Sequence, residues 1–182
     1  SSIPLDTQTQ IDLYEKEIIR VDETLANLKL TIETDEAKDQ SKFQDQQLSF
    51  TEQIKVYTEN GDRKNANKIQ NKLDRLPNPA NKAPWKERRK EYQEAVNKLE
   101  KEKSGYIENR EEIFANLTIN PDVTLEIERL QKEREQTLKN ISDQIQSLYS
   151  QKAEFAQSQF DKLDQQSQNL RDAEMLEQQL IQ

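Results

Sequence analysis

A stripe of large apolar residues near the start of the chain constrains the fold more than any other feature. Its members follow one another at steps of three and four residues: Ile11, Tyr14, Ile18, Val21, Leu25, Leu28 and Ile32. Such steps average 3.5 residues, which keeps one side of a helix turned toward a partner helix. The sequence therefore predicts a long helix that packs in a bundle or coiled coil.

The composition agrees with this prediction. Hydrophobic residues make up 32% of the chain and charged residues 34%, so the chain is less apolar than an ordinary globular domain. Long helices that share a narrow stripe need less apolar material, because each buries only about two positions per heptad. A disordered chain can have this composition, but it lacks regular stripes. We expect the 182 residues to form one elongated helical module, residues 1–182.

Turn signals divide the chain into three helical arms, which we place at about residues 5–60, 62–117 and 122–182. At the first turn, Gly61 can adopt the left-handed conformation and Asp62 can cap the next helix. The second turn falls at Asn120-Pro121. Two sharp turns at similar spacing predict an all-α fold, an elongated antiparallel bundle that runs up, down and up.

The middle arm contains a break at residues 77–84, where Pro77, Pro79 and Pro84 stand close together. Proline lacks a backbone N–H and disfavours helix in the residue before it, so three prolines interrupt the arm. A new helix is expected to begin at Pro84-Trp85.

The net charge of −8 is unevenly distributed, because residues 62–103 carry an excess of basic residues and the outer arms an excess of acidic ones. Folding the middle arm between the outer arms brings opposite charges together, which selects an alignment more than it adds stability. Folding about Gly61 predicts the following neighbours between the first and middle arms: Arg110 near Asp12 and Glu15, and Lys103 near Glu17 and Asp22.

The apolar stripe of the first arm gives way to acidic residues after Ile32, and the same folding places Trp85 opposite this acidic stretch. We predict a waist at this level, in which Trp85, Phe43 and Phe155 form an aromatic plug. A waist of this kind is a candidate hinge or docking point. The candidate interaction residues are Glu36, Asp39, Phe43, Trp85, Arg88, Arg89 and Phe155.

Several kinds of chemistry are excluded by composition. The chain has no histidine and no cysteine, which excludes a Ser-His-Asp triad, the usual zinc sites and a thiol nucleophile. Two glycines cannot build a glycine-rich phosphate-binding loop. Acidic pairs are frequent and nothing singles one out. We therefore expect no enzyme, no catalytic or metal-binding residues and no cofactor.

A basic cluster at residues 86–90 lies next to Trp85 and is the one signal for nucleic acid. Cations that bind phosphates beside a stacking aromatic ring are typical of such sites. The chain as a whole is acidic, with a pI of about 4.9, and nucleic-acid-binding domains are usually basic. A nucleic-acid-binding accessory factor is therefore kept only as an alternative.

The sequence favours a non-enzymatic structural module, a spacer, scaffold or assembly domain that binds protein partners through helix faces. Narrow apolar stripes promote self-association, so we expect a homo-oligomer. A second alternative is an extramembrane, appendage or virion stalk excised from a larger protein, because the chain begins at Ser1 without an initiator methionine. The sequence contains no membrane-spanning run and no signal-peptide pattern. We expect a soluble domain and leave open whether it is cytoplasmic or extracytoplasmic.

Overall fold

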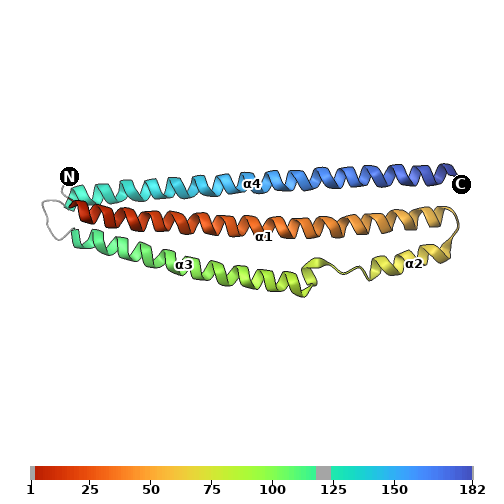
Figure 1. Cartoon of the computed structure of the whole chain (residues 1–182), viewed down its shortest axis with the longest axis horizontal. Helices are drawn as coiled ribbons and strands as arrows, with labels where there is room; N and C mark the ends of the chain where they lie inside the picture. Colours follow the sequence, from red (N-terminus) through yellow and green to blue (C-terminus); the bar gives the residue numbers. More distant parts are fainter. Residues whose placement is uncertain (1–2, 118–123, 182) are drawn as a thin grey trace. The chain divides into compact units, whose positions relative to one another are not determined.

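The computed structural model describes residues 3–117 and 124–181, and the predicted all-α helical bundle is confirmed. The predicted turn at Asn120-Pro121 lies outside the described residues. The elements in chain order are α1 (Leu5–Glu59), α2 (Arg63–Asp74), the short 3-10 helix η1 (Pro79–Asn81), α3 (Ala83–Leu117) and α4 (Thr124–Ile181), all drawn in Figure 1.

The chain divides into two compact units, and we describe each one by itself. Unit 1 comprises Ser1–Thr31 and Lys90–Lys152, and unit 2 comprises Ile32–Arg89 and Ala153–Gln182. Helices α1, α3 and α4 contribute residues to both units. A single module over residues 1–182 stays a prediction.

The turn between α1 and α2 has the predicted chemistry. Gly61 has a φ of 73°, in the left-handed region that a Cβ disfavours. The Asp62 side chain accepts a hydrogen bond of 3.1 Å from the backbone N–H of Asn65, which satisfies one of the unpaired donors of the first helical turn. The predicted cap at Asp62 is confirmed, and together with the turn at Gly61 it separates α2 from α1.

The predicted break in the middle arm is also present. Helix α2 ends at Asp74 and α3 begins at Ala83, with η1 between them. The Asn78 side chain accepts a hydrogen bond of 3.0 Å from the backbone N–H of Ala80 and so caps η1. Pro84 falls in the first turn of α3, where its missing N–H removes no helical hydrogen bond. The break therefore ends where α3 begins, at Ala83, just before Trp85.

In unit 1, the apolar stripe of α1 packs against α3 and α4. Ile11 of α1, Phe114 of α3 and Ile127 of α4 are almost completely buried and form the core. Ile18 and Val21 of the predicted stripe are buried as well. Helix α3 runs antiparallel to α1, since Lys103 meets Asp22 while the later residue Arg110 meets the earlier residue Glu15. The stripe thus faces the same chain, as predicted.

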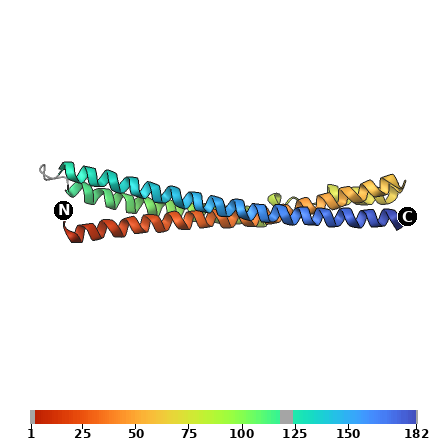
Figure 2. The same ribbon diagram turned by 90° about the horizontal axis from the view of Figure 1, so that it is seen from above.

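Unit 2 has a different interior. The only described side chains in it that are buried and apolar are those of Ala66 and Trp85. Between α1 and α4 the contacts are polar: Ser41 bonds to Asp164, and Arg171 lies 2.7 Å from Asp45 and 3.5 Å from Glu52. Because residue numbers rise together on the two helices, α1 and α4 run parallel, as the chain direction in Figures 1 and 2 also shows.

Candidate interaction site

The centre of the candidate site is Trp85, at the start of α3 in unit 2. Its side chain is buried, with 6% of its surface exposed. The indole Nε1–H donates a hydrogen bond of 2.8 Å to Oδ2 of Asp39 on α1. A buried indole N–H needs such a partner, and Asp39 supplies it from the acidic stretch that interrupts the apolar stripe. Trp85 therefore lies beside this acidic stretch, as predicted.

Two arginines extend the contact along α3. Arg89 donates to both carboxylate oxygens of Glu36, at 2.8 and 3.0 Å, and its guanidinium carbon lies 5.3 Å from the centre of the Trp85 ring. The hydrogen bond to Glu36 and the charge of Glu36 raise the pKa of Arg89. Arg88 also donates to Oδ2 of Asp39, the oxygen that accepts from Trp85, at a distance of 3.5 Å. The five residues form one connected polar and aromatic group, which we call the waist cluster.

A hollow of about 300 Å³ lies against the waist cluster, between α1 and the proline-containing break. The lining combines the apolar rings of prolines with the charges of one carboxylate and two lysines. The lining residues are Asp39, Lys42, Phe43, Gln46, Leu76, Pro77, Pro79, Lys82, Pro84 and Trp85. Phe43, which was predicted to pack with Trp85, is half-buried and lines this hollow together with Trp85.

Phe155 does not belong to the waist cluster, and the predicted aromatic plug is wrong in this respect. Two thirds of its surface (67%) is exposed. The face of α4 that is turned toward α1 in unit 2 carries Asp164 and Arg171 instead. At 3.6 residues per turn, Phe155 falls on the opposite side of α4 from both. The prediction rested on residue level along the helix and took no account of the direction of the side chain.

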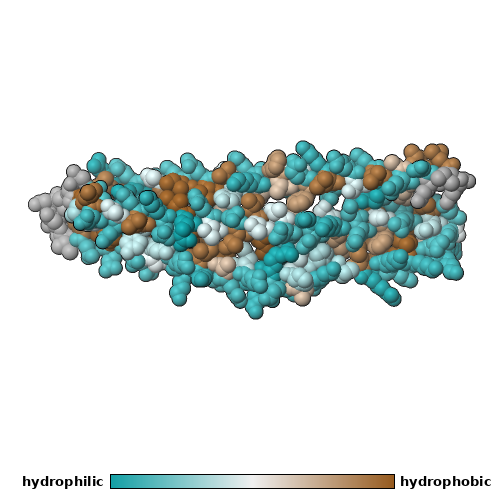
Figure 3. Space-filling view, viewed as in Figure 1, coloured by the Kyte–Doolittle hydropathy of each residue, from teal (hydrophilic) through white to brown (hydrophobic). Residues whose placement is uncertain are grey.

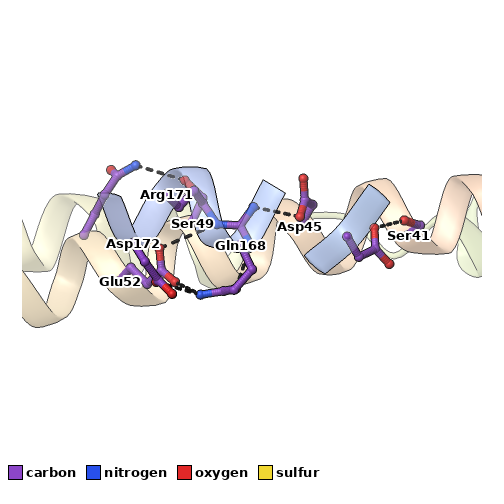
Figure 4. Close-up of polar contacts among 9 residues, drawn as sticks. Ser41, Asp45, Ser49, Glu52, Gln168, Arg171 and Asp172 are labelled. Carbon is purple, nitrogen blue, oxygen red and sulfur yellow. Dashed lines mark hydrogen bonds and ion pairs between the residues drawn. The ribbon is translucent and has the colours of Figure 1, made fainter. Parts of the chain in front are cut away.

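Further along unit 2, a polar layer joins α1 to α4 (Figure 4). Gln168 donates a hydrogen bond of 2.6 Å to Glu52, and Arg171 donates one of 2.7 Å to Asp45. The Arg171 side chain is only 14% exposed. Sequence reasoning missed this layer, because the polar residues of α4 that face α1 look like solvent-facing residues in the sequence.

In unit 1, the predicted ion pairs form in part. Lys103 Nζ lies 2.7 Å from Asp22, and Arg110 Nε lies 3.8 Å from Glu15. Asp12 pairs with Arg134 of α4 at 2.9 Å, so its predicted pairing with Arg110 needs correction. The reason is that Arg134, one helix turn after Leu130, reaches α1 at this level.

Glu17 also requires a correction. It pairs with Arg20 of its own helix at 2.8 Å, one turn away, whereas Lys103 was the predicted neighbour. The hydrogen bond to Glu17 and its charge raise the pKa of Arg20. A local partner three residues away needs less ordering of side chains than a partner on another helix.

Arg134 binds two carboxylates at once, with Glu15 at 2.5 Å in addition to Asp12. Burial alone would lower the pKa of Arg134, but the hydrogen bonds to Asp12 and Glu15 outweigh it and raise the pKa. The charged form of the guanidinium is therefore the one that the fold stabilises. The contribution of these pairs to folding stability is present below the ordinary pKa of arginine, and it is lost only as the pH rises through the pKa in the folded state.

Arg110 of α3 is almost completely buried, with 3% of its surface exposed. Its guanidinium carbon lies 5.2 Å from the centre of the Phe114 ring. Among the described residues, its Nε and one Nη atom have no hydrogen-bond partner. The arginine is thus held by stacking and by the charge of Glu15, with donors left unsatisfied.

Comparisons with known proteins found no matching family model, curated protein or solved structure. Over residues 3–117 and 124–181, no group of three or more acidic, histidine or cysteine side chains is arranged to hold a metal ion. No helix in these ranges has the length and apolar character needed to cross a membrane.

Proposed function

We propose that this chain is a non-enzymatic structural module, a helical spacer or scaffold that presents helix faces to protein partners. The observation that carries the proposal is the set of ion pairs that α1 makes with α3 and α4. In unit 1 the acidic residues of α1 meet Lys103, Arg110 and Arg134, and in unit 2 those of α1 meet Arg88, Arg89 and Arg171.

Such pairs are suited to fixing an alignment. Exposed ion pairs contribute little stability, at most about 1 kcal/mol each, but a shifted register would place like charges together. A scaffold depends on the relative position of its helices more than on a reactive group. The charge pattern therefore supports a role in which a fixed alignment is the useful property.

The contacts of Arg88 and Arg89 support this proposal over the nucleic-acid alternative. Both guanidinium groups are turned to carboxylates of α1, which offset the charge that a phosphate would need. We expect no binding of short single-stranded DNA or RNA at low salt by fluorescence anisotropy. Salt-dependent binding that R88E/R89E abolishes would favour the alternative.

Pulsed dipolar spectroscopy tests the structural proposal directly. The chain has no cysteine, so spin labels can be placed at Gln44→Cys on α1 and Gln165→Cys on α4, both exposed positions of unit 2. The labelled chain is diluted into unlabelled chain, so that only distances within one molecule contribute. A single narrow distance supports a spacer with fixed register. A broad distribution would contradict it.

A further inference from the structure

Helix α4 carries an apolar stripe on the side of unit 2 that is turned away from α1. Phe155, Leu163, Leu170 and Leu180 are between 57% and 80% exposed. At 3.6 residues per turn these four side chains fall within an arc of about 100°, and we call them the outer stripe. Figure 3 shows brown patches along the α4 side of the molecule, separated by hydrophilic surface.

The opposite face of the same helix segment is polar. Asp164, Gln168 and Arg171 lie about half a turn from the outer stripe and bond to α1. The segment thus uses polar residues inside unit 2 and leaves its large apolar side chains outside. Single exposed apolar residues are ordinary, but this series recurs on one helix face, as the apolar residues of paired helices do.

We propose that the outer stripe binds the outer stripe of a second copy of this chain, with the two α4 helices antiparallel. This inference deepens the proposed scaffold function, on which it rests, by naming the partner and the surface. Two features of the stripe select this occupant: the spacing of its apolar residues and the position of an acidic residue among them.

The spacing is close to symmetric about Ser167. In an antiparallel pair centred there, Phe155 of one copy lies level with Leu180 of the other, and Leu163 lies within about two residues of Leu170. Each apolar side chain of one copy therefore meets an apolar side chain of the other. Isologous dimers require this self-complementarity, because one surface must match itself after a two-fold rotation.

An acidic residue within the stripe favours the same arrangement. Glu177 is exposed, and at 3.6 residues per turn it falls inside the arc of the outer stripe. Parallel pairing in register would place Glu177 against Glu177, and such a like-charge contact disfavours an arrangement. Antiparallel pairing centred near Ser167 separates the two carboxylates by roughly 30 Å along the helix axis.

Sedimentation equilibrium of the full chain over micromolar concentrations tests the pairing. We expect a reversible dimer, and we expect Leu163→Arg or Leu170→Arg to raise its dissociation constant at least about tenfold, since each buries a charge in the stripe. Leu13→Arg is the matched control, because Leu13 is 56% exposed on α1 in unit 1, and it should leave the constant unchanged. A chain that remains monomeric, or a dimer that only Leu13→Arg weakens, would overturn the proposal.

Cross-linking tests the orientation. Gln166→Cys, near the centre, should form a disulfide between copies, whereas Gln159→Cys should not, because antiparallel pairing separates the two thiols by roughly 24 Å along the helix axis. A disulfide at Gln159→Cys would overturn antiparallel pairing. A monomeric chain with a narrow spin-label distance in unit 2 would contradict only the pairing of two copies. A broad distance distribution would contradict the scaffold function.

Discussion

The indole nitrogen of Trp85 donates a hydrogen bond of 2.8 Å to the carboxylate of Asp39, a residue 46 positions earlier in the chain. This bond links the start of α3 to the acidic stretch of α1, and both residues also line the hollow. It also explains why the apolar stripe of α1 can stop here. An acidic residue is needed where the partner helix presents a donor and two arginines.

Trp85→Ala should lower the free energy of unfolding by about 3–5 kcal/mol, because it removes a large buried side chain and a hydrogen bond to a charged group. Urea denaturation followed by circular dichroism measures this. Phe155→Ala is the control, since its exposed ring should contribute little to folding of the monomer. Equal stability of the Trp85 variant and the natural chain would contradict the assigned role of the waist cluster.

The two glycines should respond to alanine in opposite ways. Gly61→Ala should lower the free energy of unfolding by about 1 kcal/mol, because residue 61 has a φ of 73°. Gly105→Ala should raise it by about 0.5–1 kcal/mol, because Gly105 lies within α3 and a Cβ there meets nothing within 4 Å. Thermal and urea denaturation of the two variants would test this, and a loss of stability in both would contradict the account of Gly105.

Sequence reasoning located the helices and the waist because both depend on local signals or on residue level. The glycine turn, the aspartate cap and the proline break are each set by neighbours in sequence. Folding the chain about Gly61 then placed Trp85 opposite Glu36 and Asp39, since every residue along a helix advances by the same rise.

The direction of side chains on α4 was not accessible in the same way. A period of three and four residues identifies an apolar face but does not say what covers it. In unit 2 the inward face of α4 carries Asp164 and Arg171, while the apolar face that includes Phe155 lies outside. The partner of Asp12 was predicted wrongly for a related reason. Both α3 and α4 carry an arginine near its level, and only the packing of the helices determines which one pairs with it.

Loss of the Arg171 side chain should destabilise the fold much more than loss of the Arg89 side chain. Arg171→Ala should cost roughly 2–4 kcal/mol, because its 14%-exposed side chain is the partner of both Asp45 and Glu52, whose carboxylates would be left half-buried. Arg89→Ala should change the denaturation midpoint little, since the Arg89 side chain is 58% exposed and water can replace its contacts with Glu36. Similar midpoints for the two variants would contradict the polar layer in unit 2.

Arg110→Met should stabilise the chain by roughly 1–3 kcal/mol. The substitution removes buried donors that have no partner among the described residues and keeps apolar contact with Phe114. Glu15 remains paired with Arg134. Calorimetry would measure the change, with Arg110→Ala as a control that leaves a cavity. A less stable methionine variant would show that the arginine is better satisfied than its contacts indicate.

Disulfide formation between Ser41→Cys and Asp164→Cys tests the central claim, that α1 and α4 of unit 2 are held side by side in a fixed register. The two native side chains are hydrogen-bonded, so their backbones lie near the separation of about 4–7 Å between Cα atoms that a disulfide requires. Under mild oxidation of dilute chain, we predict rapid formation within one molecule on a non-reducing gel. Ser41→Cys with Arg171→Cys, about 10 Å further along α4, should react much more slowly. Equal rates, or disulfides only between molecules, would contradict the register.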